Sequence, residues 1–416
     1  MNTYKLTFQL KQHTPMIHFQ GDQHGATLRA TELKPKLDRF IIEQEELTEV
    51  RNEKQVPKSG FESWFISKDH LALNYRVKIN AGKVTSDEIK RDVDKLPTFF
   101  ANMGDEYKKS LKYLSKAEHE ITLEFYARNE KLRNAISKHI SGFLWLHNFG
   151  SRQSKGFGSF LLQTDEFQST HFDVTFELDT TRIRNAPWTN NNSISSENWS
   201  LELDLFGALD IFYKSLRSGI NRKGRGGVSK FYIKPAIFYF SMLELNQQWD
   251  KKSIKEYYFP RDLNKQKIEH NNSDILAFSD DQPTKVLIKD LFGLSSKESW
   301  RSYSSEVKKS NSEIDRFTSP VLFKPFNLGN GKYKVGIKCT PIDSDFLGAR
   351  FDIEMGNSSG LQLTLPDSFS WKDFWNFYFS RLPELSSRLG KNIPNQERTI
   401  EYQILSAIDR TINQVS

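Results

Sequence analysis

The chain has 416 residues, of which 37% are hydrophobic and 13% aromatic, so an intrinsically disordered protein is excluded and two or three domains fit. Its formal net charge of +7 permits a polyanionic partner without requiring one. The single cysteine, Cys339, excludes an intrachain disulfide and a cysteine-rich zinc site, and it fits a reducing compartment.

The sequence shows no sign of export or of membrane insertion. The N-terminal stretch MNTYKLTFQL has no apolar signal-peptide core. No stretch approaches the ~20 apolar residues that a membrane span needs. We therefore expect a cytoplasmic protein with no membrane partner, and no residue pattern predicts a metal site or a cofactor.

The N-terminal part of the chain predicts the order β-α-β-β-α-β. Apolar and polar residues alternate over 4–10, as in a half-buried strand. Helical spacing predicts a helix that begins at Thr27 or at Pro35, and a second helix that begins after Asn129 and ends before Gly150. The other predicted segments are strands at 70–80, 120–127 and 158–163, and a loop or insertion at 43–69.

The rest of the chain begins a similar pattern again. A strand is predicted at 172–179 and a helix at 201–220. The aromatic run 231–240 looks like a strand that Pro235 places at a sheet edge or breaks in two. Residues 250–318 are highly charged and look like an insertion of short helices. The later predictions are a hairpin around 328–332, a strand at 361–366 and a helix that opens at Ser370.

These patterns predict an α+β fold of two ferredoxin-like domains, which have the RRM-like βαββαβ order. The first domain would span 1–165. The second, diverged from the first, would span 170–416 and carry an insertion at about 250–315. Such a domain places helices on one face of a four-stranded antiparallel sheet and leaves the other face open to a ligand or a neighbour.

The stretch FGSRQSKGFGSF, residues 149–160, is the first candidate site, and we call it the glycine-rich loop. Its glycines are Gly150, Gly156 and Gly158, and its cations are Arg152 and Lys155. Glycines allow positive φ and close backbone approach, and exposed N–H groups beside cations make an anion-binding concavity. It is not a P-loop, because it lacks Gly-Lys-Ser/Thr and follows a helix. It suits a sugar-phosphate backbone; the alternative is a tight connection whose charges are incidental.

A second candidate is the stretch 217–240, which has six basic residues, five aromatic residues and no acidic residue. Basic side chains can bind phosphates, and aromatic rings can stack on bases. The alternative is that the rings belong to a core and the charges are solvated. The candidate RNA contacts here are Arg222, Lys223, Arg225 and Lys230.

Polar residues around the first predicted strand-to-helix loop form a third candidate. They are His13, His18, Asp22 and His24. Histidine can act as a general acid or base near neutral pH, as RNA cleavage requires. The spacing of His18 and His24 is not a recognised metal-binding spacing. His18, Asp22 and His24 are therefore weak catalytic candidates, and ordinary polar loop residues are the alternative.

These features together resemble the RAMP superfamily of CRISPR proteins (Cas7-like). That superfamily shares a glycine-rich loop of the G-x-R/K-x-x-x-G-x-G kind before the last strand, and Gly150, Arg152, Gly156 and Gly158 fill this pattern. Within it, the chain is most similar to the first RAMP subunit of the Cmr-type (type III-B) effector complex. The similar segments are LTFQLKQHTPMIHF with ATLRATELKPKLDRFI, and RFTSPVLFKPF at 316–326.

The resemblance implies a non-catalytic subunit of an antiviral ribonucleoprotein, which binds CRISPR RNA and target RNA beside other RAMP subunits. Its RNA-backbone contacts would be the glycine-rich loop together with Arg29, Lys34 and Arg39 of the first helix. One alternative is a metal-independent RAMP endoribonuclease with His18 or His24 as the base. Another is a protein scaffold whose basic loops face acidic neighbours.

Overall fold

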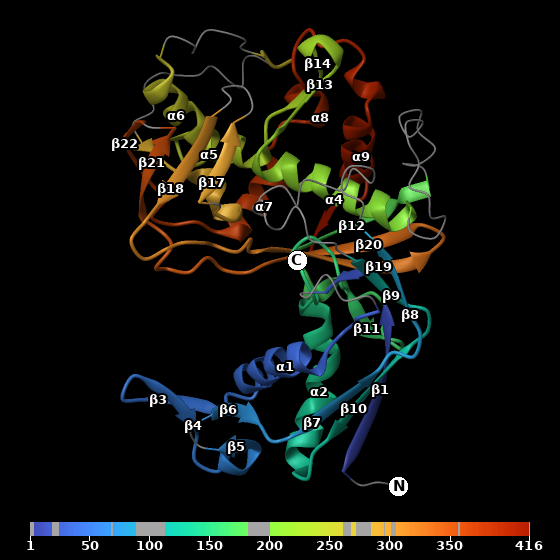
Figure 1. The fold of residues 1–416 in the computed structure, drawn as a ribbon. Coiled ribbons are helices and arrows are strands. Elements are labelled where there is room, and N and C mark those ends of the chain that lie inside the picture. Colours follow the sequence, from blue (N-terminus) through green and yellow to red (C-terminus); the bar gives the residue numbers. More distant parts are fainter. Residues whose placement is uncertain are drawn as a thin grey trace.

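The structure is a computed structural model, shown as a ribbon in Figure 1. The described residues are 4–18, 25–67, 70–88, 113–181, 200–260, 268–271, 284–294, 296–300, 305–356 and 358–415. Within these ranges, no helix combines the length and the apolar composition that crossing a bilayer requires.

The N-terminal half, residues up to Phe172, is built on a four-stranded antiparallel sheet (Figure 1). The strands stand in the order β11-β1-β10-β7, and helices α1 and α2 lie side by side against them. Leu10 of β1 lies opposite Ile121 of β10 and Leu162 of β11, and Leu10 and Ile121 enter one buried cluster. The elements are β1 (Lys5–Gln12), α1 (Ala30–Gln44), β7 (Arg76–Asn80), β10 (Ile121–Tyr126), α2 (Glu130–Leu146) and β11 (Phe160–Leu162). Beside them lies a sheet of β2 (Met16–Ile17), β9 (Tyr113–Ala117) and β8 (Val84–Glu88).

Helix α1 begins at Ala30 and contains Pro35, so the predicted helix exists and starts before the proline. Proline cannot donate to the carbonyl group of Thr31, and an interior proline costs a helix about 3 kcal/mol. Pro35 faces solvent, whereas Leu33 and Leu37 are fully buried. Burial of such side chains stabilises by about 1.5–3 kcal/mol each, which is enough to offset the proline.

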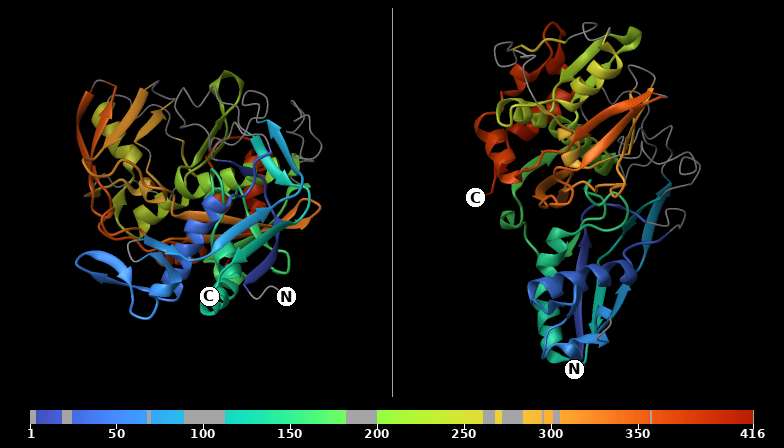
Figure 2. Two further views of the ribbon diagram at one scale, coloured as in Figure 1. Left: turned by 60° about the horizontal axis from the view of Figure 1, so that its bottom comes forward. Right: turned by 90° about the vertical axis from the view of Figure 1, so that its left-hand side faces the viewer.

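The segment predicted as a loop over 43–69 instead forms two hairpins, which project from the N-terminal half (Figures 1 and 2). We call residues 48–73 the hairpin arm. The first hairpin turns at Asn52 and Glu53, both with positive φ. Two-residue hairpin turns favour glycine at such positions, so Asn-Glu gave no clear turn signal. The elements are β3 (Thr48–Arg51), β4 (Lys54–Pro57), the 3-10 helix η1 (Glu62–Trp64), β5 (Phe65–Ser67) and β6 (His70–Leu73).

The C-terminal half contains a second four-stranded antiparallel sheet, in the order β19-β20-β12-β23. When the four strands of each sheet are counted in chain order, the first strand lies between the third and the fourth in both sheets. Helices α4 and α9 contact each other, and α9 contacts β12. The architecture is therefore α+β, and the hairpin predicted around 328–332 is confirmed. The elements are β12 (Val174–Asp179), α4 (Ser200–Arg217), β19 (Val321–Gly329), β20 (Lys332–Cys339), α9 (Ile400–Asp409) and β23 (Asn413–Gln414).

The aromatic run 231–240 is not a single strand. Strand β14 (Ser229–Ile233) ends before Pro235, and helix α5 (Ala236–Leu243) begins directly after it. A proline before the first helical residue is compatible with a helix start, because no helical N–H group is lost there. All residues from Ala236 to Ser241 are buried, so the helix has no polar face that its sequence could show.

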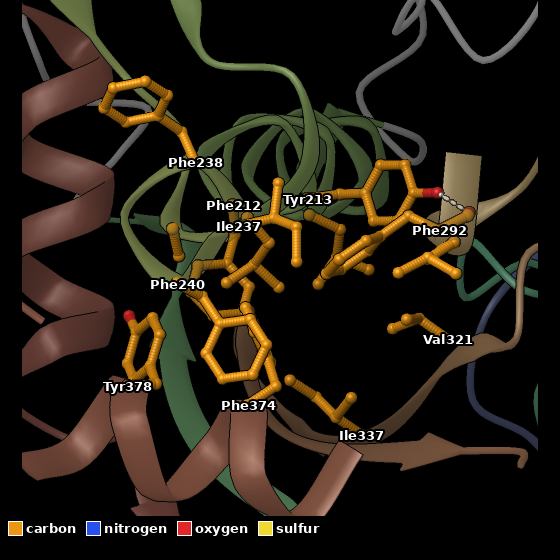
Figure 3. Close-up of a cluster of buried hydrophobic side chains, with 14 of the residues drawn as sticks. Phe212, Tyr213, Ile237, Phe238, Phe240, Phe292, Val321, Ile337, Phe374 and Tyr378 are labelled. Atoms are coloured by element: carbon orange, nitrogen blue, oxygen red, sulfur yellow. Dashed lines mark hydrogen bonds between the residues drawn. The ribbon is translucent and has the colours of Figure 1, made fainter. Parts of the chain in front are cut away.

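Helix α5 contributes Ile237, Phe238 and Phe240 to the larger hydrophobic cluster (Figure 3). Its Phe240 meets Phe374 of α7 with ring centroids 5.6 Å apart, and Phe212 of α4 belongs to the same cluster. The hydroxyl group of Tyr213 donates to the carbonyl oxygen of Phe292 at 2.6 Å. The elements around this core include α7 (Trp371–Ser380), α8 (Leu385–Arg388) and the 3-10 helix η8 (Ile288–Phe292).

The region predicted as an insertion of short helices also contains strands. Two of them pair with later strands in a sheet of order β17-β18-β21-β22. Lys309 of β18 points inward and pairs with Asp290 at 2.6 Å and Glu298 at 2.8 Å. A charged residue at a buried position conceals the alternation by which a strand is predicted. The elements are α6 (Asp250–Tyr258), β17 (Lys297–Trp300), β18 (Ser305–Ser310), β21 (Arg350–Met355) and β22 (Ser358–Thr364), with a short parallel pair, β15 (Gln247–Gln248) and β16 (Thr284–Lys285).

Candidate nucleic-acid interface

The three glycines of the glycine-rich loop are buried between close neighbours. Gly150, Gly156 and Gly158 have φ values of +81°, +86° and +66°, as their residue type predicts. A Cβ atom on Gly158 would overlap the carbonyl oxygen of Phe149, and one on Gly150 would overlap the carbonyl oxygen of Ile17. Close packing by itself therefore requires glycine at these two positions.

Several backbone N–H groups of the loop bind other parts of the protein. The N–H group of Gly150 donates to the Glu32 carboxylate at 2.8 Å, and that of Ser151 donates to the carbonyl oxygen of Ile17 at 2.7 Å. The N–H group of Gly158 donates to the carbonyl oxygen of Pro15 at 2.9 Å. At these positions the donors already have acceptors, so an anion would have to meet other groups of the loop.

The glycine-rich loop also joins the two halves of the molecule through strand β19. The ammonium group of Lys324, on β19, is fully buried and donates to the carbonyl oxygens of His147 at 2.8 Å and Phe160 at 3.2 Å. Burial holds the pKa of Lys324 well below its usual value. The side chain of Asn148 donates to the carbonyl oxygen of Phe323 at 2.8 Å. These bonds fix the position of the loop relative to both halves.

The tip of the loop, residues 151–155, is partly exposed and brings cations together. The Lys155 ammonium lies 3.1 Å from the ring centroid of Tyr213 on α4. Burial, followed by the charges of Arg217 and Arg152, lowers the pKa of Lys155 well below its usual value, and Asp210 opposes this shift. We call Arg152, Lys155 and Arg217 the cationic cluster. The sequence analysis includes Arg217 in the basic stretch 217–240 but not among its candidate RNA contacts, because α4 reaches the loop only through tertiary folding.

The three candidate cations near helix α1 have different surroundings. The Lys34 ammonium binds Asp38 at 2.6 Å and the carbonyl oxygen of Leu73 at 2.9 Å, so it faces the hairpin arm. Arg39 is exposed on α1, and Arg29 is partly exposed directly before the helix.

A lysine that the sequence analysis did not select contacts the glycine-rich loop instead. Lys36 donates to the side chain of Gln153 at 2.8 Å and to the carbonyl oxygen of Asn148 at 3.1 Å. It also pairs with Glu32, one helical turn earlier, at 3.0 Å. The sequence does contain a signal for Lys36: it lies four residues after Glu32, and residues at this spacing lie on one face of a helix.

The second basic stretch forms a separate surface, the basic hairpin, made of β13 (Ile220–Lys223), β14 and their turn. Lys223 and Lys230 are exposed, and Arg222 pairs with Glu401 of α9 at 3.0 Å. Arg225 lies in the turn. Figure 1 shows this hairpin at the far end of the C-terminal half, whereas the glycine-rich loop connects α2 to β11 at the boundary between the halves. The structure therefore keeps the basic hairpin apart from the glycine-rich loop, and of the stretch 217–240 it brings Arg217, at the end of α4, to Lys155.

The candidate histidines show no open catalytic arrangement in the described ranges. His18 is 3% exposed, and Asp22 and His24 lie outside the described residues. His13 is buried; its Nδ1 accepts the N–H group of Asn327 at 2.9 Å, and burial lowers its pKa to about 3. Among the described residues, no group of three or more His, Cys, Asp or Glu side chains could hold a metal ion.

Comparisons with known proteins give two family matches. Residues 3–220 match the model of the Cmr1 N-terminal domain, and residues 232–400 match the model of the Cmr1 C-terminal domain. No curated protein matches the chain. One chain of a solved structure, the "Cryo-EM structure of the Type III-B Cmr-beta bound to cognate target RNA", matches with 13% identity and a TM-score of 0.27. That match covers 39% of this chain and 60% of the solved chain, so this chain spans less than two thirds of it.

Proposed function

Because the chain belongs to the Cmr1 family, we propose that it is a non-catalytic subunit of a type III-B CRISPR effector ribonucleoprotein that binds the backbone of guide or target RNA. The family matches confirm the resemblance to RAMP proteins that the glycine-rich loop indicated. The matched solved structure is titled as a type III-B Cmr assembly with target RNA, which agrees with this role. Other subunits of such a complex would be its protein partners.

We also propose that each half is a ferredoxin-like domain, at 1–165 and 170–416. The shared strand order of the two four-stranded sheets supports this interpretation. The two separate hydrophobic clusters support it further, since one draws on residues up to Phe172 and the other mostly on residues from Val174 onward. The sheet of β17, β18, β21 and β22 would then be an addition to the second domain.

The observation that carries the RNA-binding proposal is the cationic cluster at the loop tip. Arg152 and Lys155 lie in the loop and Arg217 lies at the end of α4, and the Lys155 ammonium rests against the ring of Tyr213 on that helix. Burial, followed by the charges of Arg217 and Arg152, lowers the pKa of Lys155. A phosphate group placed there would favour the charged lysine and would be attracted by all three side chains. Gly150, Gly156 and Gly158 would then shape the loop that presents the cations.

The basic hairpin is a second contact under this proposal. Lys223 and Lys230 are exposed on it, and Arg222, which is also exposed, forms an ion pair with Glu401. Arg225, in the turn between the two strands, is the fourth basic residue of the hairpin. Two separate basic surfaces on one subunit suit a long polyanion better than a single phosphate ligand.

The test is the salt dependence of binding to a labelled single-stranded RNA, measured by fluorescence anisotropy. The variant combines Arg152→Ala with Lys155→Met, because methionine keeps the apolar contact with Tyr213. The matched control is Lys372→Ala, which removes an exposed charge on α7. If both cations meet phosphates, the slope of log affinity against log salt falls by about 1.4, since each contact contributes about 0.7 for single strands. A folded double variant with the slope and affinity of the control would refute the proposal.

A further inference from the structure

We propose that Lys36 and Gln153 are positioning residues, which hold the tip of the glycine-rich loop in the backbone conformation that presents Arg152 to an RNA phosphate. The inference rests on the proposed RNA-binding role of the cationic cluster and concerns how that cluster is set in place. Neither residue would touch RNA. Lys36 acts through Gln153, and Gln153 acts through the backbone of its neighbour Arg152.

Arg152 has an uncommon backbone conformation. Its φ is +62°, in the left-handed region that glycine adopts freely and other residues adopt rarely. A residue with a side chain persists there only when the structure around it imposes the conformation, and such residues are concentrated at functional sites. The contacts around Arg152 therefore have to hold it in place.

The two ends of the loop tip are fixed on opposite sides of Arg152. Before it, the N–H group of Ser151 donates to the carbonyl oxygen of Ile17 on β2 at 2.7 Å. After it, the carbonyl oxygen of Ser154 accepts the N–H group of Phe323 on β19 at 3.2 Å. These bonds leave the centre of the tip to be set by the residue directly after Arg152.

That residue, Gln153, is held by three hydrogen bonds. Its Nε2 donates to the carbonyl oxygen of Gly150 at 2.7 Å, and its Oε1 accepts from the ammonium group of Lys36 at 2.8 Å. Its carbonyl oxygen accepts from the side chain of Asn148 at 2.8 Å. A lysine can only donate, so its contact with Gln153 determines which way the amide group points. Side chain and backbone of Gln153 are thus both fixed, next to Arg152.

The ammonium group of Lys36 uses all three of its donors within the protein. Its acceptors are the Glu32 carboxylate at 3.0 Å, the side-chain oxygen of Gln153 at 2.8 Å and the carbonyl oxygen of Asn148 at 3.1 Å. The same oxygen of Glu32 also accepts the N–H group of Gly150 at 2.8 Å. To contact a phosphate, Lys36 would have to give up one of these bonds, so its geometry fits holding the loop.

A loop that is held in advance binds RNA more tightly, because ordering it no longer opposes binding. Without the contact between Lys36 and Gln153, Arg152 would relax towards a negative φ. Its guanidinium group would then leave the place where its charge acts on Lys155. We therefore expect the loss of either positioning residue to weaken RNA binding only through Arg152.

A double-mutant cycle on the full chain tests this dependence, with RNA affinity measured by fluorescence anisotropy. We expect Lys36→Met to weaken binding at least about fivefold in the wild type and less than about twofold in Arg152→Ala. The control is Lys252→Met on α6, which removes a lysine from an i,i+4 ion pair of similar exposure and should change affinity less than about twofold. Equal losses in both backgrounds would overturn the inference, because they would indicate a direct phosphate contact or a general loss of structure.

Gln153→Leu gives a second measurement, because it removes the amide bonds without changing the charge of the protein. Counterions are released where a cation meets a phosphate. If Arg152 loses its phosphate, the slope of log affinity against log salt should fall by about 0.7, as it should for Arg152→Ala. A Gln153→Leu slope equal to that of the wild type, beside a reduced slope for Arg152→Ala, would contradict the inference.

Hydrogen exchange in the free chain separates this inference from the proposed function, because it needs no RNA. Mass spectrometry follows peptides that cover 149–160. We expect Lys36→Met and Gln153→Leu to speed exchange there at least about tenfold, and Lys252→Met to leave it unchanged. Unchanged exchange in the first two variants would overturn the inference. Faster exchange beside an Arg152→Ala variant that binds RNA like the wild type would confirm the hold on the loop and refute the RNA contact.

Discussion

Replacing Gly158 with alanine separates the structural role of the glycine-rich loop from a role in contacting RNA. Gly158 has a φ of +66°, and an added Cβ atom would lie 2.9 Å from the carbonyl carbon of Phe149 and overlap its oxygen. The matched control is Gly226→Ala on the basic hairpin. Gly226 has a similar φ of +76°, but nothing lies within 4 Å of the position that its Cβ atom would take.

The two substitutions share one energy term and differ in another. Placing a side chain in the left-handed region costs about 1–2 kcal/mol, which is the whole expected loss for Gly226→Ala. Gly158→Ala adds overpacking of a buried site, at about 1–3 kcal/mol. We therefore expect Gly158→Ala to lower the free energy of unfolding by about 2–5 kcal/mol, clearly more than the control.

Urea unfolding followed by tryptophan fluorescence measures this difference, and RNA affinity is measured on the same preparations. Equal destabilisation by the two variants would refute the packing argument. A Gly158→Ala variant that kept its stability but lost RNA affinity would show instead that the glycine is needed for close approach of the RNA backbone.

Three further predictions concern the buried lysine and two histidines. The pKa of Lys324 is lowered on folding, so below pH 10.5 the unfolded state binds a proton that the folded state holds less tightly, and this favours unfolding. The stability of the wild type relative to Lys324→Met should therefore rise as pH increases towards 10.5, and urea unfolding at pH 7 and pH 10 measures the rise. The pKa of His13 is lowered from 6.5 to about 3, so protonation of the unfolded state destabilises the fold as pH falls below 6.5. At pH 5 the free energy of unfolding of the wild type should have fallen by about 2 kcal/mol more than that of His13→Gln. Unfolding free energies of the two proteins that fall in parallel with pH would contradict this. Since His18 is buried, labelled RNA should stay intact in EDTA; cleavage that disappears in His18→Ala would support an endoribonuclease instead.

Local patterns in the sequence predicted the regular elements whose signals lie within a few residues. Helix α2 begins after Asn129, whose side chain accepts the N–H group of Leu132 at 3.1 Å, as the predicted cap requires. The glycines at 150, 156 and 158 adopt the positive φ values that their pattern indicated. Local patterns failed where burial removed the polar face of a helix, as in α5, or placed a charge inside a strand, as with Lys309.

The sequence by itself determined the family, the backbone geometry of the glycine-rich loop and the presence of two basic segments, because these depend on residue type and short spacing. Only the tertiary structure decided that Lys36 and not Lys34 reaches that loop, that Arg217 joins Lys155, and that the basic hairpin lies elsewhere. The physical reason is that burial and charge are set by neighbours far away in the chain. Lys324 binds the loop region across more than 160 residues of sequence, and no local pattern encodes that contact.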